Sequence, residues 1–181
     1  MKKIIVILLV LVSAQVFSQN FENLMVGETA KNFTTKTIQG DEIIFSEINN
    51  NSSVVLIVLR GWVGSQCPVC SRQVGQFIEN AGRLKELGAE VVLVYPGPSD
   101  ELQSKANEFT EDFKLPDNFH FTLDPDYLMI NKYGLRWDAP KETAYPSTFV
   151  IDKRGKIVYS KISKTHGGRA KVDEVLKVLE K

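Results

Sequence analysis

The stretch Arg60-Gly61-Trp62-Val63-Gly64-Ser65-Gln66-Cys67-Pro68-Val69-Cys70 contains both cysteines of the chain, separated by two residues. It follows the apolar run Val54–Leu59, which predicts a strand buried on both faces, as in a parallel sheet covered by helices. Apolar residues then recur at helical spacing from Val74 to Leu84, so we expect an amphipathic helix to begin at the cysteines. The stretch therefore predicts a strand, a loop and a helix that carries two thiols at its start.

The helix start explains why two cysteines at this spacing favour redox chemistry. A sulfur at the first position lies near unpaired backbone N–H groups and the positive end of the helix dipole. Both stabilise the thiolate, which is the reactive form of cysteine. Cys70 follows Cys67 by one turn on the same face, roughly 5 Å away and within the range of a disulfide. A bridge between such close neighbours constrains the unfolded chain little, so the spacing favours a nucleophile with its own resolving partner over a structural disulfide.

Composition points to one globular domain without strong charge. The chain has 181 residues, of which 43% are hydrophobic, enough for a single core and too many for a disordered protein. Lys and Arg together equal Asp and Glu, 22 each, so nothing predicts binding to nucleic acid or to anionic lipid.

The first 18 residues have the pattern of a secretory signal. Lys2 and Lys3 precede the apolar run Ile4–Val12, and Val16 and Ser18 are the small residues before a plausible cut. An uncleaved membrane anchor is the alternative, but it needs about 20 apolar residues. We therefore expect a signal peptide at 1–18, a domain at 19–181, export to the periplasm or the medium, and no stable membrane insertion after cleavage.

Along the mature chain, strand and helix patterns alternate. The expected strands cover 33–38, 43–45, 54–59, 90–95, 119–123, 148–151 and 156–159. The expected helices run from Cys67 to Gly88, from a cap at Ser99 to Phe113, from a cap at Asp124 to Gly134, and over 172–179, with polar loops at 49–53 and 135–144. This order predicts an α/β fold with a mixed central sheet flanked by helices, an N-terminal β-hairpin and an inserted β-α unit.

With the strand, the Cys67-Pro68-Val69-Cys70 helix start and the later Tyr145–Gly155 segment, the chain resembles the thioredoxin superfamily. It is most similar to the alkyl hydroperoxide reductase/thiol-specific antioxidant family, in its peroxiredoxin-like redoxin branch, which shares Arg60-Gly61-Trp62 and the Cys-Pro-x-Cys pattern. The resemblance covers roughly 24–180 and implies a thioredoxin-like fold. It also implies that Cys67 attacks, that Cys70 resolves, and that no cofactor is needed.

Three further residues are candidates for shaping the site. The resemblance places Pro146 at the position of a cis proline that packs against the cysteines, and the alternative is an ordinary proline at the start of a strand. Arg60 is expected either to lower the pKa of a thiol or orient a peroxide oxygen, or to be a solvated arginine. Trp62 is expected either to cover the thiols or to pack as an ordinary large aromatic. His166 is a weaker candidate, as a base for Cys67.

The sequence also departs from the family pattern. Gly64 stands three residues before Cys67, where peroxiredoxins have Thr or Ser, and Arg60 stands where they have Pro. Gln66 replaces the Trp that precedes the first cysteine of thioredoxins, as if residues 63–66 lengthened the loop. The peroxide-binding groups of the family therefore do not carry over residue by residue.

Two substrates remain open at this point, and a thioredoxin-like protein is the expected electron donor for either. The first hypothesis is an exported antioxidant that reduces peroxides through Cys67 and Cys70. The alternative is a thiol–disulfide oxidoreductase that acts on exported proteins. A copper-binding assembly factor is only a minor alternative. Copper chaperones of this fold have three residues between their cysteines, whereas this chain has two. No zinc site is expected, since only His120 and His166 could add ligands and both are isolated.

Overall fold

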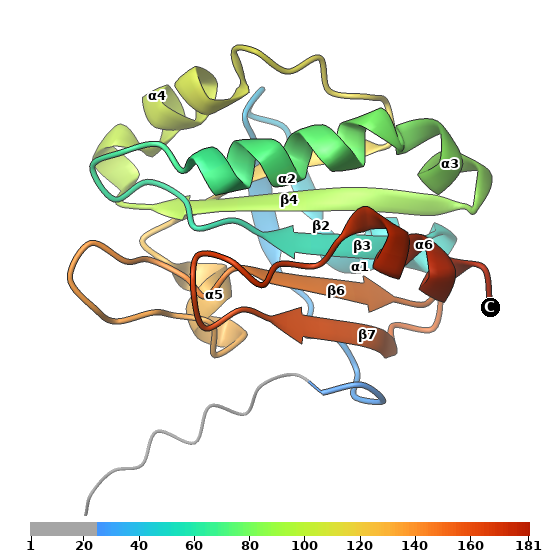
Figure 1. Cartoon of the computed structure of the whole chain (residues 1–181). Coiled ribbons are helices and arrows are strands. Elements are labelled where there is room, and N and C mark those ends of the chain that lie inside the picture. The colour runs from blue at the N-terminus through green and yellow to red at the C-terminus, as the bar shows by residue number, and fades with distance from the viewer. Residues whose placement is uncertain (1–24) are drawn as a thin grey trace, which may run out of the picture.

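The computed structural model describes residues 25–181 and shows one sheet with helices on both faces (Figure 1). The predicted signal peptide lies outside the described residues. The strands are β1 Thr34–Thr37, β2 Glu42–Ile44, β3 Ser53–Val58, β4 Ala89–Gly97, β5 Phe119–Pro125, β6 Ser147–Ile151 and β7 Ile157–Ile162. The helices are α1 Phe45–Asn51, α2 Pro68–Glu79, α3 Ala81–Glu86, α4 Ser99–Thr110, α5 Leu128–Lys132 and α6 Val172–Leu179.

The seven strands lie in the order β2-β1-β5-β4-β3-β6-β7, which makes β3 a central strand. β3 runs parallel to β4 and antiparallel to β6, while β4 and β5 are also parallel. The hairpin β1–β2 adds to the sheet through β5, and the crossover from β4 to β6 contains α4, β5 and α5. These features confirm the predicted mixed sheet, N-terminal hairpin and inserted β-α unit.

The side chains of β3 alternate between two hydrophobic cores. Val55, Ile57 and the following Leu59 pack with α2, α3 and α4 on one face, the near face in Figure 1. Val54, Leu56 and Val58 pack on the other face with residues of α1 and α5. All six residues from 54 to 59 are fully buried. The apolar run of the sequence therefore forms a strand that is covered on both sides, as predicted.

The structure contains one helix where the sequence predicted a loop. The polar run at 49–53 belongs in part to α1, although Asn has a weak helix propensity. Phe45 is buried in the core, and the Asn49 amide donates to the carbonyls of Ser52 at 3.1 Å and Asp152 at 2.8 Å. These tertiary contacts stabilise a helix that the local sequence does not favour.

The single helix predicted from Cys67 to Gly88 is divided in two. Asn80 has a non-helical backbone and separates α2 from α3, and its side-chain amide donates to the Gln76 carbonyl at 2.9 Å. Such a bond to the preceding turn competes with helix continuation. Gly88, with φ of 68°, ends the second helix as expected.

The helix at Ser99 does not use the predicted cap. Ser99 is the first helical residue, and its backbone N–H donates to the Asp126 carboxylate at 3.1 Å. The cap is therefore supplied by a different segment, which sequence spacing does not reveal.

The helix predicted from Asp124 begins later than expected. Pro125 ends β5, and α5 starts at Leu128. The Asp124 carboxylate nevertheless accepts the N–H groups of Met129 at 2.6 Å and Ile130 at 3.0 Å, so it still satisfies donors of the first turn.

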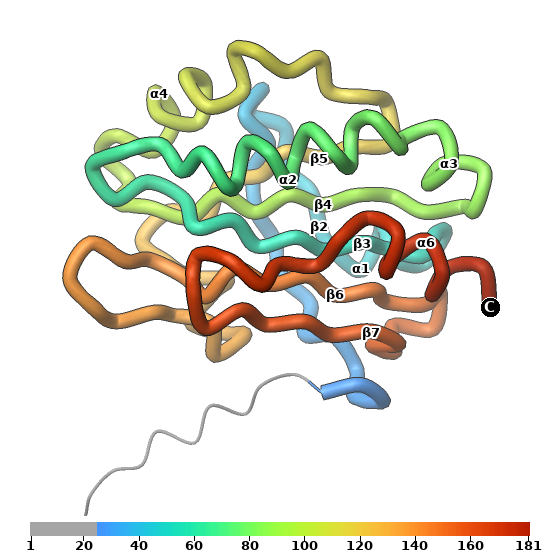
Figure 2. The backbone as a smooth tube through the Cα atoms, in the orientation of Figure 1, coloured from blue at the N-terminus to red at the C-terminus, as the bar shows by residue number. Residues whose placement is uncertain are grey.

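Three loops gather at the carboxyl end of β3, at the left in Figure 2. They are 59–67 before α2, 133–146 before β6 and 163–171 before α6. The sheet explains this meeting, because β6 is antiparallel to both β3 and β7. β3 and β7 therefore point the same way, and the loops that follow them lie at the same edge.

Gly61 fixes the start of the first of these loops. Its φ is 74°, and a Cβ atom there would lie 1.9 Å from the Pro96 carbonyl oxygen. We expect Gly61→Ala to lower the free energy of unfolding by about 2–4 kcal/mol, from left-handed strain and a clash with backbone. Gly64→Ala is the matched control: its φ is also positive, at 93°, but the space around it is open, so it should cost only about 1 kcal/mol. Chemical denaturation measures both, and equal losses would contradict this account.

Candidate active site

Cys67 is the residue that caps α2. Its backbone is extended, Pro68 occupies the first helical position, and its sulfur accepts the N–H of Cys70 at 3.4 Å. The prediction that Cys67 opens the helix is confirmed. Cys67 is 4% exposed and Cys70 1% exposed, and both are free thiols. The two sulfurs thus lie at the end of the core rather than on the surface.

The two thiols differ in acidity. A hydrogen bond from the Cys70 thiol is the main cause that lowers the pKa of Cys67 from 9.0 to about 5. The Cys70 backbone N–H and the charges of Arg169 and Arg60 act in the same direction, while burial opposes them. Burial raises the pKa of Cys70 well above its usual value, and the hydrogen bond to Cys67 adds to this effect. At neutral pH the arrangement is a Cys67 thiolate beside a Cys70 thiol.

Arg169 lies against both sulfurs. Its Nη2 is 3.3 Å from Cys70 Sγ and 3.7 Å from Cys67 Sγ. Sequence reasoning took His166 as the candidate of this loop and missed Arg169. The position of Arg169 could have been inferred only from the sheet topology. Its loop follows β7, which points the same way as β3, so this loop lies at the same edge of the sheet as the cysteines.

Arg60 is not a solvated arginine, because only 9% of it is exposed. Its backbone N–H donates to Cys70 Sγ at 3.4 Å, whereas its side chain turns to the 133–146 loop. There Nε pairs with Glu142 at 3.0 Å and Nη2 donates to the Lys141 carbonyl at 2.7 Å. Arg60 therefore joins the cysteine loop to the loop before β6.

Glu142 also binds the third loop. Its second carboxylate oxygen is 2.7 Å from His166 Nε2. Burial by itself would raise the pKa of Glu142, but the hydrogen bonds and charges of His166 and Arg60 outweigh burial and lower it. His166 lies edge-on against Trp137, which stacks on Tyr145. The His166 ring is thus held by Glu142 and Trp137. The side chain of this loop that reaches the two sulfurs is Arg169, not His166.

Trp62 contacts α4. Its Nε1 donates to Glu101 at 2.9 Å, and the Lys105 ammonium lies 4.7 Å from the ring centre. Gln66 makes a parallel connection, since its amide donates to the Lys105 carbonyl at 2.8 Å and its oxygen accepts the Tyr95 hydroxyl at 2.8 Å. The lengthened segment 63–66 is therefore held on α4 by Trp62, which precedes it, and by Gln66, its last residue. Gly64 and Ser65 are exposed between these two contacts.

Pro146 is buried at the start of β6, and its carbonyl accepts the Ser163 N–H at 2.8 Å. The described residues contain no cis peptide bond, so the Tyr145–Pro146 bond is trans and the expectation of a cis proline is wrong. The chain at this point is held by the loop that carries Arg169.

No group of three or more His, Cys, Asp or Glu side chains within residues 25–181 is arranged to hold a metal ion. In the same range, none of the helices has both the length and the apolar character needed to cross a bilayer.

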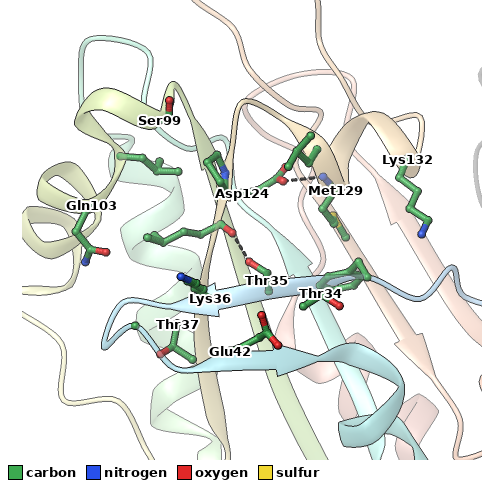
Figure 3. A pocket seen from close by; sticks show the side chains of 16 residues that line it. Thr34, Thr35, Lys36, Thr37, Glu42, Ser99, Gln103, Asp124, Met129 and Lys132 are labelled. Atoms are coloured by element: carbon green, nitrogen blue, oxygen red, sulfur yellow. Dashed lines mark hydrogen bonds between the residues drawn. The ribbon is translucent and has the colours of Figure 1, made fainter.

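A hollow of about 590 Å³ lies elsewhere, between β1, β5, α4 and α5 (Figure 3). Lys36, Glu42 and Gln103 are among the side chains at this hollow, and the buried Asp124 carboxylate at its wall is bound to the backbone of α5. No cysteine lines it, so it is separate from the dithiol.

Comparison with known proteins agrees with this geometry. The model of the AhpC/TSA family matches residues 26–160. A thiol-disulfide oxidoreductase ResA of Halalkalibacterium halodurans is 27% identical over 132 residues, covering 73% of this chain and 65% of the relative. A chloroplastic peroxiredoxin Q of Sedum lineare is 28% identical, covering 88% and 80%. The crystal structure of a peroxiredoxin-like protein from Aquifex aeolicus has a TM-score of 0.67 at 24% identity, covering 87% of each chain, and shows the same fold.

The pKa of Cys67 predicts how the reduced protein titrates. Ultraviolet absorbance of the thiolate should appear with a midpoint near pH 5, and Cys67→Ser should abolish that transition. Because folding lowers this pKa below its unfolded value, the thiolate stabilises the fold at high pH, and that stability is lost as pH falls through about 5. A midpoint close to the value of a free thiol, about 8.5, would contradict the helix-start account.

Glu142 should contribute to stability far more than a surface carboxylate does. The side chains of Arg60 and Glu142 are only 10% and 12% exposed, so Glu142→Gln leaves a buried guanidinium without its counter-charge. We expect a loss of about 3 kcal/mol in the free energy of unfolding. Glu108→Gln removes the exposed ion pair with Lys105 and should cost about 0.5 kcal/mol or less. Similar losses in the two variants would show that Glu142 does not join the loops.

Proposed function

The chain belongs to the AhpC/TSA family, and we propose that it is a thiol-dependent oxidoreductase that reduces peroxides through Cys67 and Cys70. The observation that carries the proposal is a thiolate with a pKa of about 5 that is only 4% exposed. Such a sulfur is charged at neutral pH yet accessible only to a small molecule. A peroxide fits this access better than the disulfide of a folded protein does.

The first step uses the Cys67 thiolate. Its sulfur attacks one oxygen of the peroxide, the O–O bond breaks, and the other oxygen leaves as an alkoxide or hydroxide that takes up a proton. The sulfur becomes a sulfenic acid. Cys70 then loses its proton and attacks this sulfur, the S–O bond breaks, and water leaves. The product is a Cys67–Cys70 disulfide, and a thioredoxin-like donor would return it to the dithiol by exchange.

Other predicted residues support this chemistry indirectly. Arg60 lowers the pKa of Cys67 through its charge and donates its N–H to Cys70. Trp62 and Gln66 hold the lengthened loop on α4. We propose that Arg60, Trp62 and Pro146 shape the site, while Cys67 and Cys70 react.

A second candidate function is thiol–disulfide exchange with protein partners. It is favoured by the position of Cys70 one turn from Cys67 on the same helix, since a disulfide between neighbours of this kind forms without local unfolding. The relative named ResA carries this activity in its name. Reduction of insulin measured beside peroxide consumption separates the two substrates.

We also propose that the protein acts outside the cytosol, in the periplasm or as a secreted protein. The proposal rests on the sequence pattern of residues 1–18. In an oxidising compartment a disulfide persists, so turnover requires a dedicated electron donor.

Single-cysteine variants test the proposed function. With hydrogen peroxide or cumene hydroperoxide, Cys67→Ser should lose all activity, because no other residue attacks the peroxide. Cys70→Ser should consume one equivalent and stop at the sulfenic acid, which a dimedone adduct reveals by mass spectrometry. Wild-type rates no faster than those of a free thiol would reject peroxide as the substrate.

A further inference from the structure

We propose that Arg169 is a catalytic residue of the second step, in which its guanidinium stabilises the Cys70 thiolate that attacks Cys67. The inference rests on the proposed dithiol chemistry and adds to it a residue for resolution. It holds for peroxide and for disulfide substrates alike, because both pathways end with Cys70 attacking Cys67.

The contacts favour Cys70 over Cys67 as the partner of Arg169. Nη2 is 3.3 Å from Cys70 Sγ and 3.7 Å from Cys67 Sγ, so one nitrogen lies within reach of both sulfurs and is nearer the resolving one. Within residues 25–181, Arg169 is the one cationic side chain that hydrogen-bonds either sulfur. The guanidinium of Arg60 is instead bound to Glu142 and to the Lys141 carbonyl.

Other bonds fix the guanidinium at this place. Nη1 donates to Gln73 Oε1 at 3.0 Å, and Nε donates to the His166 carbonyl at 3.1 Å. Gln73 is 5% exposed and lies one turn beyond Cys70 on α2, where its amide also contacts Thr148. The residues Cys67, Cys70 and Gln73 thus present one face of α2 to Arg169. A guanidinium held in this way loses little entropy when it binds a thiolate.

The second step needs such a cation more than the first. Cys67 has the helix start and the Cys70 thiol to stabilise its charge, but Cys70 is buried and its proton is hard to remove. Its sulfur must become anionic inside the core before it can attack. A charge-assisted hydrogen bond from Arg169 offsets the cost of that burial.

The steps can be followed with one equivalent of the neutral reagent 4,4′-dithiodipyridine. Cys67 attacks one sulfur of the reagent, its S–S bond breaks, and a first thiopyridone leaves. Cys70 then loses its proton and attacks Cys67 Sγ, the mixed disulfide breaks, and a second thiopyridone leaves. The two absorbance phases report the two steps separately, and Cys70→Ser identifies the first phase because it shows that phase alone.

At about pH 8 we expect the Cys67 thiolate to persist without Arg169, because the hydrogen bonds from the Cys70 thiol and the Cys70 N–H, the two largest causes that lower its pKa, remain in place. We therefore expect Arg169→Gln to slow the second phase about 10- to 100-fold, the range for a hydrogen bond to a charged group, and the first phase only slightly. Arg169→Lys should restore part of the second rate, since it keeps the charge. Arg72→Gln removes an equivalent charge from an exposed position on α2 and should change neither phase.

The outcomes separate this inference from the proposed function. A wild-type protein that releases only one thiopyridone contradicts the resolving role of Cys70 and the inference with it. A wild type that releases two, beside an Arg169→Gln variant with an unchanged second phase, contradicts the inference alone. Equal slowing of both phases, or no rescue by Arg169→Lys, would assign Arg169 a structural role. Failure of peroxide and insulin as substrates would reject the proposed function and leave this measurement interpretable.

Discussion

The first turn of α2 decides the chemistry of this protein, because there the Cys70 thiol gives the Cys67 sulfur its main stabilising hydrogen bond and the Cys70 N–H donates a second one. The second bond exists because Cys67 has an extended backbone and caps the helix, with Pro68 at the first helical position. One interaction therefore satisfies a donor of the helix start, stabilises the thiolate and brings the two cysteines within one turn of each other. The fully buried run 54–59 and the fixed turn at Gly61 determine where this helix begins.

Around the dithiol, the loops are joined by side chains rather than by regular secondary structure. Arg60 binds Glu142, Glu142 binds His166, and the His166 carbonyl accepts Arg169, which returns to the sulfurs. The connections form a ring that crosses all three loops. Because Glu142 binds both Arg60 and His166, which lie in different loops, a change at this carboxylate affects both of the other loops.

The difference in acidity between the two thiols follows from their depth. Cys67 lies at the helix start and its thiolate is stabilised by the Cys70 thiol and N–H, whereas Cys70 is one turn deeper and burial raises its pKa. The same geometry therefore keeps Cys67 as a thiolate nucleophile and Cys70 as a resolving thiol that loses its proton less easily. Low exposure of both cysteines favours a small reagent in the first step, and it makes a fixed cation valuable in the second.

The sequence by itself determined the succession of strands and helices along most of the α/β fold, the helix start at Cys67 and the redox interpretation of the cysteines, because these depend on local periodicity and short spacings. It also indicated the inserted β-α unit and the terminal hairpins. Only the tertiary structure decided the helix at Phe45–Asn51, the break at Asn80 and the trans bond before Pro146. It likewise decided that Arg169 lies at the sulfurs and Trp62 on α4, since these contacts join segments up to 102 residues apart. No local pattern encodes such contacts; they arise when parallel strands bring their following loops to one edge of the sheet.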